Sequence, residues 1–344
     1  MNRPIQIELA YPFATPPEAG ELRQLAAGVY WLRMPLPIAL NHINLWLIAD
    51  GEGWVIVDTG LATDEIRGIW QQVFSQLNGP VTRVIVTHFH PDHLGLAGWL
   101  LEQFNVPLLM SAGEYLSAHL VCNQLGGLST AAMIEQFRAN GLEQPHLDAF
   151  AAMQGGYKAS LSTLPLHYQR LRDLDHVEIG AHRWQVICGY GHSPEHVSLY
   201  CPELNLFIAG DMLLPKISTN ISVFAVNAWD DALGYFLDSL NRYAELLPPS
   251  TLVLPSHGLP FVGVQTRVAA LHAHHDEHLK LTLHSCSTAK SAREIMQVLF
   301  DRELSTYQIM FAMGESIAHL NHLVHNKRLL RTQDAQGIYR FQQN

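Results

Sequence analysis

The segment HFHPDH places three histidines and an aspartate within six residues. In an extended chain, alternate side chains share a face, so His88 and His90 point the same way. The proline that follows bends the chain, and Asp92 and His93 begin an apolar helix pattern. Imidazoles and a carboxylate gathered in this way are typical ligands of divalent ions such as zinc.

Four further residues of ligand type come directly after apolar runs elsewhere in the chain. They are Asp58 in VIVDTG, His192 in GHSPEH, Asp211 in FIAGDML and His257 in LPSHG. Layered α/β folds gather their sites on loops at strand ends, because a rigid sheet holds those loops in place. We therefore expect these residues to lie beside HFHPDH.

Strand and helix patterns alternate around the first motif. Strand patterns at 28–49 and 54–60 are separated by a DGEG turn, which is typical of a hairpin. Residues 62–77 carry apolar side chains at helical spacing and end at NGP. A strand at 81–87 leads into the motif, and a helix then runs to about residue 104. This order predicts a layered α/β core.

The middle of the chain changes character and then returns to strands. Residues 111–172 show short helix patterns and predict a helical insertion, either a lid over a site or ordinary helical packing. Hairpin patterns follow at 176–191 and 197–211, with a helix at 230–247 and a strand at 251–255. The pattern favours two sheets packed face to face with helices outside.

The C-terminal part shows three helix patterns followed by a small hairpin. This order is typical of a winged-helix module, so we expect a catalytic domain over 1–265 and a linker helix with a winged-helix-like domain over 266–344. HAHHDEH spaces His274 and His278 one helical turn apart. An isolated spacing match is weak, so a solvated helix face is expected there.

The motifs together resemble those of the metallo-β-lactamase-fold hydrolases. THFHPDH is similar to the HxHxDH signature, and GHSPEH, AGD and PSHG follow in the family's order, over about residues 25–262. The C-terminal pattern resembles the lactamase-β-2-like subgroup. This resemblance implies a four-layer αββα sandwich with a small helical, winged-helix-like C-terminal domain.

The resemblance also implies a ligand set for two divalent ions. The first ion would be bound by His88, His90 and His192. The second ion would be bound by Asp92, His93 and His257. Asp211 would bridge the ions, and Asp58 would fix a ligand imidazole from behind, unless it is only a turn residue. Zn²⁺ is favoured, with Mn²⁺ and Fe²⁺ as alternatives, because His and Asp suit all three.

Such a pair of ions would generate a bridging hydroxide by lowering the pKa of water from about 15.7 toward about 7. Either a metal-bound water or Asp92 would carry the proton. His90 stands where the flavodiiron relatives have Glu, which favours hydrolysis over oxygen reduction. The Ser in GHSPEH lacks the GxSxG elbow of serine hydrolases. The expected function is hydrolysis of a small ester, thioester or lactone.

Substrate contacts and partners are less constrained by the sequence. Asn41, His42, His196 and Tyr168 are the candidate contacts to a small acyl substrate. A single-strand-specific ribonuclease and a non-catalytic metal-binding sensor are the alternatives. The net charge of −10 disfavours nucleic acid as a partner without excluding a local basic patch.

The composition bounds the remaining expectations. The 344 residues are 48% hydrophobic, which is enough for a large core, and the four cysteines form no CxxC pair. No stretch resembles a signal peptide or a membrane span. We expect a reduced cytoplasmic protein without membrane contact, and a homodimer as one arrangement.

Overall fold

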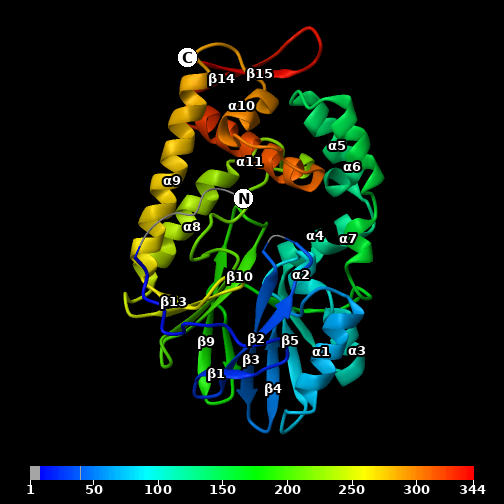
Figure 1. Cartoon of the computed structure of the whole chain (residues 1–344), viewed down its shortest axis with the longest axis vertical. Helices are drawn as coiled ribbons and strands as arrows, with labels where there is room; N and C mark the ends of the chain where they lie inside the picture. The colour runs from blue at the N-terminus through cyan, green and yellow to red at the C-terminus, as the bar shows by residue number, and fades with distance from the viewer. Residues whose placement is uncertain (1–7, 39) are drawn as a thin grey trace.

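Two β-sheets pack face to face and helices cover both outer faces (Figure 1). Figure 1 is a computed structural model, which describes residues 8–38 and 40–344. The four layers are those expected from the sequence, and a helical region follows them at the C-terminal end. Within the described residues, no helix is both long and apolar enough to cross a membrane. The cysteines are all free.

The first sheet has seven strands in sequence order. They are β1 (Arg23–Ala26), β2 (Val29–Pro35), β3 (His42–Asp50), β4 (Gly53–Val57), β5 (Val81–Ile85), β6 (Leu108–Ser111) and β7 (Gln169–Leu171). On its outer face lie α1 (Asp64–Phe74) and α3 (Ala97–Phe104). Thr63 caps α1 by accepting from the Ile66 N–H, and Trp70 is buried against the sheet. The loop that carries HFHPDH follows β5 of this sheet.

The second sheet has six strands in the order β13-β12-β11-β10-β9-β8. They are β8 (His176–Ile179), β9 (His182–Gly189), β10 (His196–Cys201), β11 (Leu206–Gly210), β12 (Leu252–Pro255) and β13 (Phe261–Val262). The helix α8 (Ala232–Leu246) buries Phe236, Leu240 and Tyr243 in the core on its outer side. Between the sheets lies an apolar core that includes Trp31, Trp46 and Trp184.

The predicted helical insertion contains α4 (Ala112–Cys122), a short 3₁₀ turn, α5 (Thr130–Ala139), α6 (Gln144–Ala152) and α7 (Gly156–Ala159). Phe137 of α5 and Phe150 of α6 are buried in one cluster with Ile295 and Ile309 of the C-terminal region. The insertion therefore packs against the C-terminal helices.

The C-terminal region has the predicted order of three helices and a hairpin. Its elements are α9 (Val264–Ser285), α10 (Ala292–Leu299), α11 (Thr306–His325), β14 (Leu329–Gln333) and β15 (Tyr339–Gln343). The expectation of a solvated face at 272–278 is wrong, because α11 packs against this part of α9. His275 is fully buried, and His274 and His278 are partly buried.

The two sheets are joined by hydrogen bonds at one end. Asn44 of β3 donates from its backbone N–H to the Ser256 carbonyl at 2.7 Å. Its side-chain amide donates to the carbonyls of Pro255 and Gly258, each at 2.8 Å, and its oxygen accepts from the Trp31 indole N–H. The buried Asn44 side chain thus satisfies three polar groups between the sheets.

Replacement of this side chain is expected to destabilise the protein. Asn44→Ala leaves buried polar partners unsatisfied, so the free energy of unfolding should fall by about 1–3 kcal/mol. Urea denaturation followed by circular dichroism measures the change. Asn78→Ala, at an exposed position, is the matched control. Equal stability of the two variants would contradict the role given to Asn44.

Candidate metal centre

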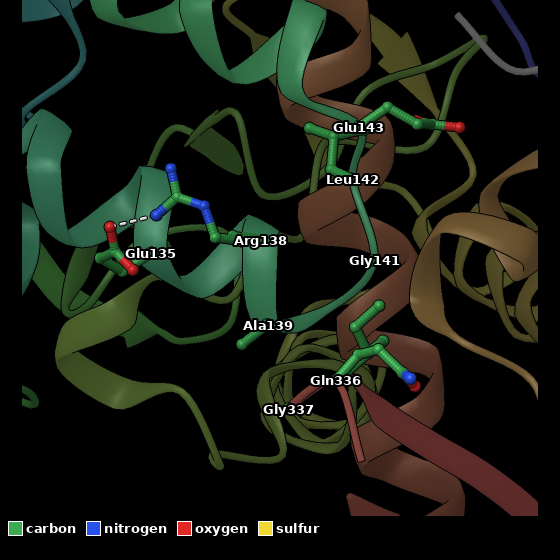
Figure 2. Close-up of a pocket in the computed structure, with 9 residues that line it drawn as sticks. Glu135, Arg138, Ala139, Gly141, Leu142, Glu143, Gln336 and Gly337 are labelled. Atoms are coloured by element: carbon green, nitrogen blue, oxygen red, sulfur yellow. Dashed lines mark hydrogen bonds and ion pairs between the residues drawn. The ribbon is translucent and has the colours of Figure 1, made fainter. Parts of the chain in front are cut away.

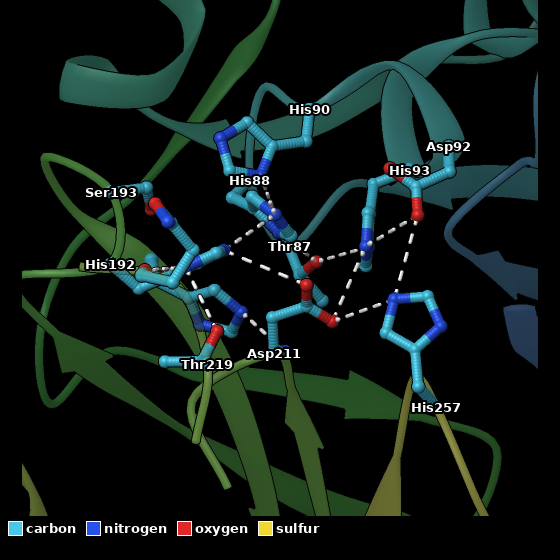
Figure 3. A network of polar contacts seen from close by, with 12 residues as sticks. Thr87, His88, His90, Asp92, His93, His192, Ser193, Asp211, Thr219 and His257 are labelled. Atoms are coloured by element: carbon cyan, nitrogen blue, oxygen red, sulfur yellow. Dashed lines mark hydrogen bonds and ion pairs between the residues drawn. The ribbon is translucent and has the colours of Figure 1, made fainter. Parts of the chain in front are cut away.

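Each sheet contributes one half of the site, and the halves meet where the strands end (Figure 3). From the first sheet, Asp58 follows β4, and the motif follows β5 and leads into the short helix α2 (Pro91–Leu94). From the second sheet, His192 follows β9, Asp211 follows β11 and His257 follows β12. The Val197 N–H donates across the sheets to the Thr87 carbonyl at 2.8 Å.

The first group consists of His88, His90, His192 and Asp211, which could together hold a metal ion. Nε2 of His88 lies 2.9 Å from Nδ1 of His90 and 3.2 Å from Nε2 of His192. Nε2 of His192 lies 3.6 Å from Oδ2 of Asp211. Ligand atoms at about 2.0–2.1 Å from a tetrahedral ion are about 3.3–3.4 Å apart, so these separations match such a site closely.

The second group consists of Asp92, His93 and His257. Nε2 of His257 lies 3.5 Å from Oδ2 of Asp92, and Nε2 of His93 lies 3.7 Å from the same oxygen. Oδ1 of Asp211 lies 3.4 Å from Nε2 of His257 and 3.5 Å from Nε2 of His93. The separations in this second group, 3.4–3.7 Å, are slightly longer than those in the first and are also near the spacing around a tetrahedral ion.

Asp211 is shared, because its two oxygens face different groups. Oδ2 faces His192, whereas Oδ1 faces His93 and His257. The preceding Gly210 has a φ of 53°, and a Cβ there would lie 2.3 Å from Nε2 of His196. Glycine is therefore required for the turn that presents this carboxylate.

The ring nitrogens away from the centre have polar partners that orient the imidazoles. Nδ1 of His192 donates to the Asn220 carbonyl at 2.7 Å, and Nδ1 of His257 donates to the His42 carbonyl at 2.8 Å. Nδ1 of His93 lies 2.8 Å from Oδ2 of Asp58. With these protons on Nδ1, each Nε2 presents a lone pair to the centre.

Two buried atoms of the centre lack a hydrogen-bond partner among the described residues. They are Nε2 of His93 and Oδ1 of Asp211. Burial of unsatisfied polar atoms costs free energy unless another group binds them. A divalent cation between the two groups would satisfy both atoms, so the residues present fit a metal.

Comparison with known proteins agrees with this geometry. Residues 39–257 match the family model described as "Metallo-beta-lactamase superfamily". The chain belongs to the metallo-beta-lactamase superfamily. Residues 279–344 match the model described as "Metallo-beta-lactamase-like, C-terminal domain". With superfamily membership and a His/Asp cluster, the protein is a metal-dependent hydrolase.

The regions matched by individual similar proteins span most of this chain. A crystal structure of a beta-lactamase domain protein from Burkholderia ambifaria is 44% identical, with a TM-score of 0.90 over 98% of both chains. A metallo-beta-lactamase family protein from Thermus thermophilus is 27% identical, with a TM-score of 0.80 over 93% of this chain and 100% of that one. A probable metallo-hydrolase of Bacillus subtilis is 26% identical over 69% of this chain and 73% of its own length.

Carboxylates lie behind and between the imidazoles of this site. Asp58 is buried with a φ of 62°, and it accepts from the Thr87 N–H at 2.8 Å. Burial opposes a charge on His93, but Asp58, Asp92 and Asp211 raise its pKa well above the ordinary value. The same negative field favours a metal cation at Nε2.

Glu114, which the sequence reasoning missed, joins the two ligand loops. Its fully buried carboxyl accepts from the Phe89 N–H at 3.0 Å, the Ser193 hydroxyl at 2.7 Å and the Glu195 N–H at 2.6 Å. Burial raises the pKa of Glu114 to about 7. No motif marks this residue, because it lies in the first turn of α4 and far from both loops in sequence.

The four predicted substrate contacts lie in different environments. Nε2 of His42 accepts from the Gly258 N–H at 2.8 Å, and Asn41 contacts the other nitrogen of that ring. His196 is fully buried, and its Nε2 accepts from the Asp211 N–H. Tyr168 stacks on Tyr115 at 4.0 Å between ring centroids. His42 thus contacts the backbone next to His257, and His196 contacts the backbone of Asp211. Both rings therefore lie beside candidate metal ligands.

A separate cavity of about 430 Å³ lies between the α5–α6 region and the β14–β15 turn (Figure 2). Its lining includes Arg138, Glu143 and Gly337, and none of the residues of the two metal groups. This cavity therefore lies apart from the candidate metal centre. The centre is identified by the metal-binding residue types that meet at the ends of the strands.

The contact between Asp58 and His93 generates a testable prediction. Asp58→Asn keeps the size of the side chain but removes its charge, so metal affinity should fall by about 10–100-fold. Competition with a chromophoric chelator measures the affinity. Asp64→Asn, which alters a fully exposed carboxylate, should leave the affinity unchanged. An unaltered metal affinity in Asp58→Asn would mean that Asp58 only shapes the turn and does not support the binding of the metal.

Proposed function

We propose that the protein is a dinuclear metal-dependent hydrolase of small esters, thioesters or lactones. The observation that carries the proposal is the division of Asp211, whose two oxygens face two separate groups of ligands. Two ions so placed would supply Lewis acidity, which activates water and polarises an acyl oxygen. Zn²⁺ is the proposed ion, since imidazole and carboxylate ligands at these spacings suit it.

The open side of the centre is where Asp92 and His90 lie. Both are partly buried, whereas the other five candidate ligands are buried. The Asp92 side chain is 20% exposed, compared with 4% for His257 and 0% for His93. Substrate would approach from this side, and Asp92 would hold or pass a proton there.

Tyr307 of α11 is a candidate substrate contact that the sequence reasoning missed. Tyr307 is about half exposed, with 45% of its surface accessible. Partial burial and the negative charge of Asp92 both raise the pKa of Tyr307, so its hydroxyl stays protonated and can donate. Its ring packs edge-on against Phe311 at 4.9 Å. An aromatic pair whose tyrosine lies within the field of Asp92 suits a small organic acyl group better than a polyanion.

Several basic residues of the C-terminal region are engaged within the chain, which weakens the ribonuclease alternative, whereas Arg302, Lys327 and Arg328 are exposed. Arg331 lies 3.6 Å from the Trp229 ring centroid, and Arg340 pairs with Asp334 and Glu294. Lys290 also pairs with Glu294. Cations engaged within the chain offer little charge to phosphates. A non-catalytic sensor is disfavoured because the whole ligand set is present.

A substrate panel tests the proposed function. The zinc-loaded protein should hydrolyse at least one thioester, ester or lactone, and chelation should abolish turnover. Asp211→Ala removes a ligand from both groups, so kcat/KM should fall by about 100-fold or more.

Asp238→Ala, at an exposed position on α8, is the matched control and should retain full activity. Cleavage of a single-stranded oligoribonucleotide with no acyl hydrolysis would establish the ribonuclease instead. Full acyl hydrolysis by Asp211→Ala would refute the bridging role.

The placement of Tyr307 can be tested separately. Tyr307→Phe removes one hydrogen-bond donor, and kcat/KM for the acyl substrate should fall by about two- to tenfold. Tyr235→Phe, at an exposed tyrosine of α8, controls for general effects. Unchanged kinetics in Tyr307→Phe would remove this residue from the substrate site.

A further inference from the structure

Histidines gather a second time where α9 packs against α11. His274 and His278 lie one turn apart on α9, and their ring centroids are 4.2 Å apart. Glu315 lies on the facing helix α11. One ligand atom from each of these three residues lies within 4.8 Å of the other two. The group shares no residue with the centre at the sheet ends.

The surroundings of this group are buried and contain more imidazole. Glu315 is only 5% exposed, and His275 and His319 are fully buried. The His319 ring lies 5.5 Å from that of His278. Nδ1 of His278 is buried and has no hydrogen-bond partner among the residues that the structure describes. A buried nitrogen of this kind calls for a partner.

The imidazoles of this group are in the form that binds metals. Burial, with the neighbouring His278, lowers the pKa of His274 to about 4, and burial also lowers the pKa of His278. Burial therefore disfavours the protonated form of both rings.

We propose that His274, His278 and Glu315 form an additional metal site, which takes a borderline divalent ion such as Zn²⁺ and joins α9 to α11. Two imidazoles at i and i+4 and one carboxylate match the ligand preferences of such ions. Ligand atoms around a tetrahedral ion are about 3.3–3.4 Å apart. The three side chains would therefore close by up to about 1.5 Å when an ion binds.

The position of the site suggests what the ion does. It would cross-link the linker helix to α11, whose N-terminal turn carries Tyr307. Polar contacts also continue toward the first centre, since His319 contacts His275 at 3.3 Å and His275 contacts the Ser218 hydroxyl at 3.0 Å. The neighbouring Thr219 hydroxyl contacts Nδ1 of His192 at 3.0 Å. The ion would thus stabilise the C-terminal helices beside the hydrolytic centre.

Zinc content per folded chain tests the proposal. The full-length protein is produced with added zinc, freed of excess by gel filtration and analysed by mass spectrometry for metal. Wild-type protein should carry one zinc ion more per chain than His278→Ala. The comparison concerns a difference between variants, so it does not depend on how many ions the centre at the sheet ends holds.

Two further variants make the test decisive. Glu315→Gln keeps the side-chain volume and should also lose one ion, which covers the case in which His278→Ala fails to fold. His284→Ala, at an exposed histidine of the same helix, should retain the wild-type zinc content. Equal zinc in folded Glu315→Gln and wild type would overturn the proposal. A melting temperature lowered in Glu315→Gln only when zinc is present would support the cross-link.

Discussion

The arrangement of this protein depends on holding two sheets in register at one end. The first sheet supplies HFHPDH and the second supplies His192, Asp211 and His257, so neither sheet carries the complete set of candidate ligands. Backbone hydrogen bonds from Val197 and Asn44 cross between the sheets beside these ligands. Because each ligand lies at the end of a buried strand, a shift of one sheet would separate the two halves.

Electrostatics explains why the centre accepts so many buried imidazoles. Burial lowers the pKa values of His88 and His90 well below the ordinary range, and neighbouring imidazoles add to the effect. Asp58, Asp92 and Asp211 supply negative charge on the other side, where the pKa of His93 is raised. Neutral imidazoles on one side and carboxylates on the other form an environment in which a divalent cation is stabilised.

The insertion and the C-terminal region together cover one end of the sandwich. Phe137 and Phe150 from the insertion share a core with Ile295 and Ile309, so the two segments stabilise each other. Glu114, at the beginning of the insertion, holds the loops that carry His90 and His192. Packing of the insertion is thereby coupled to the geometry of the metal centre.

The sequence predicted the layered fold, and its resemblance to a known family gave the superfamily and the residues proposed as ligands. It could do so because metal ligands at strand ends form short local patterns, such as HFHPDH and LPSHG, that are read without tertiary contacts. The order of three helices and a hairpin at the C-terminal end was likewise predictable from local periodicity.

Only the tertiary structure showed the roles of residues whose partners are distant in the chain. Glu114 accepts from residues 25 and 79 positions away, and no local pattern encodes such a contact. The predicted solvated face at 272–278 was wrong for the same reason, since α11, which covers it, begins at Thr306. Burial depends on what packs against a helix, and only the folded chain decides that.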